Sequence, residues 1–115
     1  MTGAAVKRAP PEMLQGTVDV LILRALAWEP MHGYAIARWL DARSDGVLGV
    51  DGAALYQALH RLEHRKWVAA SWGLSENNRR AKFYALTPGG RARLRSESAT
   101  WARYAEAVFK VLSPG

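Results

Sequence analysis

Apolar side chains recur at intervals of three and four residues in four stretches of the chain, and this spacing predicts four helices. The first stretch begins at Pro11 and ends at Glu29, because the residue before Pro30 is pushed out of the helical region. The second runs from about residue 32 to 43. Its predicted buried face consists of Tyr34, Ile36, Ala37 and Leu40.

The third and fourth helices have clear start signals. Asp51 is a suitable N-cap for a helix over residues 52–66. Thr87 and Pro88 supply an N-cap and a first-turn proline for a last helix that could extend to Leu112. In the third helix, one apolar stripe is predicted to face the core: Leu55, Ala58, Leu59 and Leu62.

Strands are predicted between these helices. Residues 67–72 and 82–86 are rich in aromatic and apolar side chains and flank a polar, basic stretch, which predicts a β-hairpin with a basic tip. Residues 47–50 are long enough only for a short strand. The order helix, helix, short strand, helix, hairpin, helix is the topology of a winged helix-turn-helix domain plus a C-terminal helix. The fold class is therefore mostly α with a small β-hairpin.

The same order divides the chain into three parts. Residues 1–10 lack any periodicity and are predicted to be a flexible arm. Residues 11–87 make up the winged-helix domain, and residues 88–115 form the C-terminal helix. The length of 115 residues suits a single domain with one core and leaves no room for a second, catalytic domain.

Composition narrows the cellular setting. The chain has no cysteine, which excludes a disulfide framework, a thiolate metal site and a thiol nucleophile, and suits a reducing compartment. The longest apolar run, residues 18–28, contains Arg24 and is too short to span a bilayer. We therefore expect a cytoplasmic protein that does not enter the membrane.

Positive charge is concentrated in one part of the sequence. The formal net charge is +6, and six basic residues lie between Arg79 and Arg95 without an intervening acid. A concentrated basic surface favours the capture of polyanions, which suits nucleic acid or an anionic membrane face. A solvated basic surface with no partner is the alternative.

The third helix is the candidate DNA reader. With its apolar stripe turned inward, steps of 100° per residue place Ala53, Gln57, His60 and His64 on the opposite face, flanked by Tyr56 and Arg61. Such a face can enter the major groove while the hairpin reaches phosphate or the minor groove. The predicted contacts to double-stranded DNA are Ala53, Tyr56, Gln57, His60, Arg61, Asn78, Arg79, Arg80 and Lys82.

Several of these contacts have alternative interpretations. Gln57, His60 and Arg61 could be ordinary solvated positions. Tyr56 could cap the core with its ring and leave its hydroxyl in water. Asn78, together with Asn77, could serve the turn, since asparagine tolerates left-handed backbone angles. Arg79, Arg80 and Lys82 lack such an alternative, because a basic cluster at a hairpin tip has no packing purpose.

The last helix is predicted to pair two copies of the chain. Its apolar residues recur at three, four and seven positions and form a stripe longer than one small domain can cover. A two-fold homodimer would bury both copies of the stripe, whereas a helix folded back on its own domain is the alternative. The stripe consists of Leu94, Trp101, Tyr104, Ala105, Val108 and Leu112.

One motif points to an enzyme. His60, Glu63 and His64 fit the H-x-x-E-H pattern of zinc peptidases, in which two histidines hold the metal and the glutamate acts as base. A third acidic ligand would have to be Glu76, Glu97 or Glu106, and the pattern lies on the face predicted for the DNA groove. No other catalytic or cofactor fingerprint occurs. We therefore expect no enzyme activity, no metal and no cofactor.

Three segments resemble the PadR family of bacterial transcriptional regulators in the family's order. They are LQGTVDVLILRALAWEPMHGYA at 14–35, GAALYQALHRLE at 52–63 and ENNRRAKFYALTPGGR at 76–91. The resemblance implies a winged-helix repressor acting at a promoter. It also implies a dimer formed by the C-terminal helix with help from the first helix, which adds Leu14 and Val18 to the predicted interface.

The family motif can be read onto single residues. Its recognition-helix tyrosine falls on Tyr56 and its basic wing residues fall on Arg79, Arg80 and Lys82, while Gln57 stands where the family most often has proline. The resemblance also implies that an aromatic or apolar effector could bind near the dimer interface, with Trp101 lining the pocket or simply packing in the interface. A winged-helix module that binds proteins instead of DNA is the remaining alternative.

Overall fold

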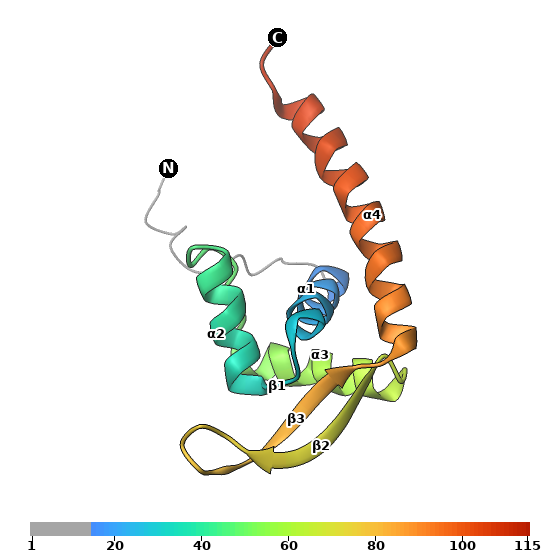
Figure 1. The fold of residues 1–115 in the computed structure, drawn as a ribbon. Helices are drawn as coiled ribbons and strands as arrows, with labels where there is room; N and C mark the ends of the chain where they lie inside the picture. Colours follow the sequence, from blue (N-terminus) through green and yellow to red (C-terminus); the bar gives the residue numbers. More distant parts are fainter. Residues whose placement is uncertain (1–14) are drawn as a thin grey trace.

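The computed structural model describes residues 15–115, which form four helices and a three-stranded antiparallel sheet (Figure 1). This confirms the predicted fold class. The predicted arm at residues 1–10 and the interface residue Leu14 lie outside the described residues. In chain order the elements are α1 (Gln15–Trp28), β1 (Met31–His32), α2 (Gly33–Arg43), α3 (Gly52–His64), β2 (Val68–Leu74), β3 (Arg80–Leu86) and α4 (Pro88–Leu112).

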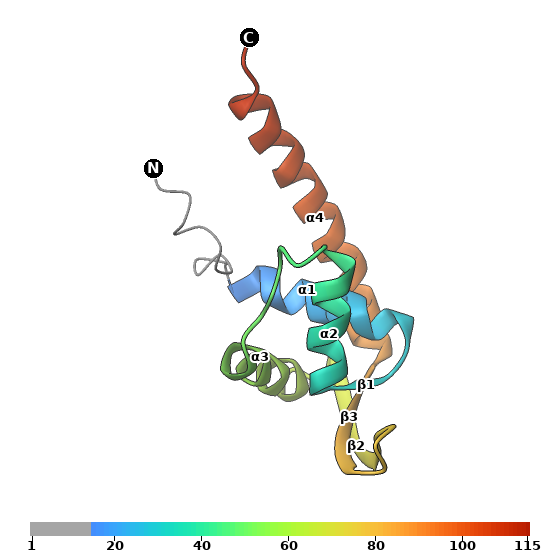
Figure 2. The ribbon, with the colours of Figure 1, turned by 90° about the vertical axis from the view of Figure 1, so that its left-hand side faces the viewer.

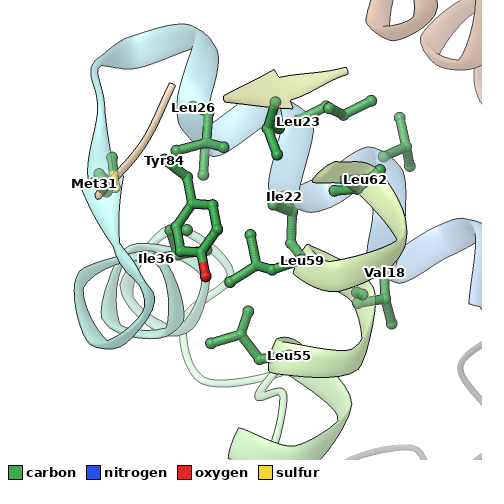
Figure 3. Packing of buried hydrophobic residues seen from close by; sticks show 14 of the residues in the cluster. Val18, Ile22, Leu23, Leu26, Met31, Ile36, Leu55, Leu59, Leu62 and Tyr84 are labelled. Atoms are coloured by element: carbon green, nitrogen blue, oxygen red, sulfur yellow. The ribbon is translucent and has the colours of Figure 1, made fainter. Parts of the chain in front are cut away.

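The core lies where α1, α2 and α3 meet over the sheet. The stripe predicted for α3 is buried in full, at Leu55, Ala58, Leu59 and Leu62. Figure 3 shows the three leucines of this stripe meeting Ile22 of α1, Ile36 of α2 and the Tyr84 ring of β3. Burying each large aliphatic side chain stabilises the fold by about 1.5–3 kcal/mol. This core fixes which face of α3 is left for solvent.

Side-chain caps mark the start of three helices. The Asp51 carboxylate accepts from the Ala54 amide at 2.9 Å, and the Thr87 hydroxyl accepts from the Gly90 amide at 3.0 Å, as the sequence predicts. His32 Nδ1 accepts from the Ala35 amide at 3.3 Å and so caps α2. Each cap satisfies a backbone donor that the helix itself leaves unpaired.

The third strand is not where the sequence analysis placed it. Residues 47–50 form a turn and irregular backbone, and the strand is instead β1, which pairs Met31 with Tyr84 of β3. The left-handed backbone of Asp45 and Gly46 redirects the chain before residue 47 reaches the sheet. A two-residue strand carries too little alternation to be recognised in sequence.

The face of α2 also needs one correction. Ile36 and Leu40 are buried as predicted, but Tyr34 is 67% exposed. It is the second residue of α2, and the Arg38 guanidinium lies 5.7 Å from its ring centre. Tyr34 is therefore a surface residue.

The predicted hairpin is present and slightly longer than expected. Its ladder runs from Val68 opposite Leu86 to Leu74 opposite Arg80. The tip is closed by backbone bonds from Ser75 to Arg79 and from Asn78 to Ser75, and Asn78 has a left-handed φ of 61°. The hairpin extends beneath α2 in Figure 1 and is the wing of the fold.

The last helix begins against the base of the wing. The Thr87 hydroxyl donates to the Lys66 carbonyl at 2.8 Å, and a Cβ placed on Gly90 would overlap the Trp67 carbonyl. Farther along, the Trp101 indole donates to the Thr17 hydroxyl of α1 at 3.3 Å. Beyond Trp101 the helix leaves the body of the molecule (Figures 1 and 2).

Candidate nucleic-acid interface

One face of α3 is free for a partner. Ala53, Tyr56, Gln57 and His60 are exposed and together line a shallow surface, opposite the buried stripe. This is the arrangement that 100° steps along the helix predict. Small Ala53 at the start of the helix leaves space for close approach of a partner.

Arg61 lies at the flank of this surface and is also tied to α1. Its Nη2 donates to Asp19 Oδ1 of α1 at 2.7 Å, and its side chain is 29% exposed. The sequence analysis grouped Arg61 with the DNA-facing residues because it flanks them on the helix. Arg61 still lines the same surface as these residues, and the carboxylate of Asp19, 42 positions earlier, holds one end of its guanidinium toward α1.

Tyr56 is held in place by a glycine. A Cβ added at Gly33, the first residue of α2, would overlap the Tyr56 hydroxyl and ring. The ring is 52% exposed, so it both packs on α2 and remains accessible. Tyr56 therefore has a packing role against α2, and its contact with DNA stays a prediction.

A groove of about 720 Å³ lies between the start of α2, Tyr56 of α3 and the wing. Sequence reasoning missed two of its aromatic residues, Tyr34 and Trp72, and one of its cations, Arg38. Tyr34 was missed because the sequence analysis assigned it to the buried face of α2, whereas the structure places it on the surface beside Arg38. Aromatic rings interleaved with arginines suit contacts to a nucleic-acid backbone. The residues lining the groove include His32, Tyr34, Arg38, Tyr56, Trp72, Arg79, Arg80 and Lys82.

The wing residues differ in how freely they can act. Arg79 and Arg80 are exposed, and the Arg80 guanidinium lies 4.6 Å from the Trp72 ring centre. Lys82 Nζ contacts Glu63 Oε1 at 3.4 Å and is only partly exposed. Asn78 adopts the left-handed turn conformation, which supports its structural role in the turn. Arg79 and Arg80 are thus the most accessible cations of the wing.

The basic stretch from residue 79 to 95 is divided by the fold. Arg93 pairs with Glu97 at 2.8 Å and lies over the Trp67 ring, away from the groove that Arg79 and Arg80 line. Acids from outside the stretch, Glu63 and Glu97, therefore offset part of its charge. The cations of the stretch that line the groove are Arg79, Arg80 and Lys82, whereas Arg91 and Arg95 are exposed on α4 away from it.

The family model described as the transcriptional regulator PadR-like family matches residues 22–96, which include α2, α3 and the whole wing. The chain belongs to this family. The predicted resemblance is confirmed, and with it the winged-helix fold of a DNA-binding transcriptional regulator.

Solved structures agree with the assignment of this regulator to the PadR-like family. A PadR family transcriptional regulator from Eggerthella lenta is 30% identical with a TM-score of 0.72, covering 90% of this chain and 88% of that one. A transcriptional regulator from Clostridium thermocellum shares the fold with a TM-score of 0.79 at 24% identity, over 89% of this chain and 99% of its own.

A curated relative is longer than this PadR-like regulator. An uncharacterized 37.1 kDa protein in transposon Tn4556 of Streptomyces fradiae is 38% identical over 102 residues, which are 89% of this chain and 28% of the relative. The chain thus spans little more than a quarter of that protein.

The residues predicted for the dimer interface of the PadR-like regulator divide into a buried and an exposed group. Val18 and Leu94, both predicted at a dimer interface, pack in the chain's own core. The residues of the predicted interface that remain accessible lie farther along α4. There Trp101, Tyr104 and Leu112 are exposed, Ala105 and Val108 are partly buried, and Phe109 and Val111, which the sequence analysis did not select, are exposed as well.

The charged and titratable groups offer little for catalysis. Across residues 15–115, no three His, Asp or Glu side chains gather as metal ligands, and Glu63 of the H-x-x-E-H pattern contacts Lys82. Burial raises the pKa of Tyr84, and the nearby Lys82 charge opposes this effect only in part. The phenol therefore stays protonated at neutral pH and acts as a core residue. No helix within this range is both long and apolar enough to cross a membrane.

Proposed function

We propose that this PadR-like regulator is a sequence-specific repressor that binds an inverted-repeat operator in promoter DNA as a homodimer. In this proposal α3 reads the major groove with Ala53, Tyr56, Gln57 and His60, and the wing at residues 73–82 contacts the backbone or the minor groove. The observation that carries the proposal is the single surface on which the free face of α3, the groove and Arg79 and Arg80 adjoin. A regulator that binds promoter DNA through this surface would block access to the promoter. In this proposal it acts in the cytoplasm.

The exposed half of α4 supports the dimer in this proposal. Phe109 and Leu112 are 69% and 71% exposed, and an apolar helix face of this kind is stabilised by a second copy. Two recognition helices placed about 34 Å apart would then read successive half-sites. An aromatic or apolar effector could stack on Trp101, whose ring meets Tyr104 edge to face at 5.7 Å.

The first prediction separates wing contacts from base readout. In Arg79→Gln/Arg80→Gln, binding should weaken on all DNA sequences, and the slope of log affinity against log salt should fall by about 1.8, because two phosphate contacts are lost. Tyr56→Ala should instead lower the preference for operator over random DNA by roughly fivefold or more, since a base contact contributes about 1–3 kcal/mol. Fluorescence anisotropy over a salt series measures both.

The control for charge is Arg91→Gln/Arg95→Gln, which removes two exposed cations from α4 away from the groove. Its affinity and slope should stay close to those of the unchanged protein. If the wing and Tyr56 variants both bind as the unchanged protein does while remaining folded, this surface is not the DNA-binding face.

The second prediction concerns the glycine beneath Tyr56. In Gly33→Ala the new methyl group would overlap the Tyr56 ring, so the ring must move at a cost of about 1–3 kcal/mol. Operator preference should therefore fall in the same direction as in Tyr56→Ala. The control is Gly16→Ala, where no heavy atom lies within 4 Å of the added carbon. Equal operator preference in the two alanine variants would show that Tyr56 does not need its position on α2.

A further inference from the structure

One turn of α1 contacts both the candidate recognition helix and the last helix. Asp19 Oδ1 accepts from Arg61 Nη2 of α3 at 2.7 Å, and two residues earlier the Thr17 hydroxyl accepts from the Trp101 indole of α4 at 3.3 Å. These contacts join segments 42 and 84 positions apart in sequence. The turn from Thr17 to Asp19 therefore links the helix that faces DNA to the helix that carries the exposed apolar stripe.

The ion pair is poorly explained as a source of stability. The Asp19 and Arg61 side chains are 22% and 29% exposed, so both charges have lost much of their water. Arg61 Nε is buried and has no hydrogen-bond partner among the residues that the structure describes. An unpaired buried donor is costly, and apolar side chains of similar volume often stabilise such a site as well or better. The ion pair is better explained by the position in which it holds α3 relative to α1.

The surroundings of the pair leave the guanidinium room to move. A pocket of about 200 Å³ adjoins it, lined by Arg65 and Trp67 just after α3 and by Arg93 and Glu97 on α4. Arg65 and Arg93 are cations and cannot pair with Arg61, and the Glu97 carboxylate is already paired with Arg93 at 2.8 Å. Asp19 is thus the group that holds the Arg61 side chain, and through it the C-terminal half of α3, against α1.

We propose that Asp19 and Arg61 are positioning residues that set the angle of α3 relative to α4, and thereby the half-site spacing that the dimer prefers. The inference rests on the proposed function. In a dimer paired through α4, any rotation of α3 in one subunit is repeated in the other, so the separation of the two reading helices changes twice over. One base pair advances by only about 3.4 Å, and a small rotation is enough to alter the preferred spacing.

The test measures spacing preference in the full chain. Asp19→Asn keeps the shape of the side chain and removes its charge. The probes are duplexes that carry the selected half-site as an inverted repeat, with the spacing changed by one or two base pairs, and a duplex with one half-site. The unchanged protein should prefer one spacing by at least about tenfold, whereas Asp19→Asn should narrow this preference to about threefold or less. Binding to the single half-site should change by less than about twofold, because Asp19 does not face the DNA surface.

Two further variants make the result specific. Glu97→Gln removes the neighbouring Arg93–Glu97 ion pair, which does not involve α3, and should keep the original spacing preference. Arg61→Lys keeps the charge but loses the planar fork, and should broaden the preference in the same way as Asp19→Asn. Thermal melting confirms that each variant is folded.

Three results would overturn the inference. Folded Asp19→Asn could retain the full spacing preference. Glu97→Gln could lose it equally, which would mean that any ion pair near α4 has this effect. Arg61→Gln could weaken binding on every duplex, with a salt slope lower by about 0.9 and Asp19→Asn unaffected, in which case Arg61 contacts phosphate directly. A wild-type protein that selects no DNA sequence at all would instead contradict the proposed function.

Discussion

A chain that ends at Thr100 should sediment as a monomer and bind operator DNA at least about a hundredfold more weakly than the full chain. The shortened protein keeps the whole core, which extends to Leu94, and loses the segment of α4 that leaves the body of the molecule. Two linked half-site contacts exceed one alone by a factor of about 10² to 10⁴, because the second contact is made at high effective concentration. Analytical ultracentrifugation and anisotropy on the same operator measure the two effects.

Point variants test whether the dimer depends on the apolar face of α4 or only on the length of this helix. Tyr104→Glu/Leu112→Glu places charges on the exposed stripe and should reproduce the monomer and its weak binding. Arg103→Ala/Glu106→Ala changes exposed polar residues in the same segment and should leave the dimer intact. Sedimentation of the unchanged chain as a monomer at micromolar concentration would refute the dimer.

Gly90→Ala should lower the free energy of unfolding by about 2–3 kcal/mol, which corresponds to a fall in Tm of about 10 °C or more. The added Cβ would overlap the backbone carbonyl of Trp67, and it would also lie 3.0 Å from the Leu86 side chain. Backbone cannot move aside as a flexible side chain can, so the start of α4 must shift away from the wing. Thermal and urea unfolding measure the loss.

The adjacent glycine is a matched control. A Cβ at Gly89 would lie 3.8 Å from its nearest neighbours, the side chains of Thr87 and Trp67, which is ordinary contact. Gly89→Ala should therefore leave stability unchanged or raise it by up to about 1 kcal/mol through helix propensity. If the two alanine variants unfold at the same temperature, the close approach of Gly90 to the Trp67 backbone does not constrain the fold.

The candidate site was only partly accessible to sequence reasoning. Placing Ala53, Tyr56, Gln57 and His60 on one face needed only the period of the helix and the apolar stripe opposite. The groove between α2 and the wing was missed, since Tyr34 and Arg38 gain significance only when the wing folds beneath them. The ion pair of Arg61 was missed for the same reason, because its partner Asp19 lies on another helix.

Local signals were sufficient for most of the secondary structure and for the orientation of α3. Asp51 and Thr87 cap the helices they precede, and Leu55, Ala58, Leu59 and Leu62 turn inward because these effects act within a few residues. Contacts between distant segments decided the rest. Pairing of β1 with β3, the burial of Val18 and Leu94, and the exposure of Tyr34 each depend on which surface another element presents. Periodicity specifies one side of an element, but the partner on that side is set by how all the elements pack together.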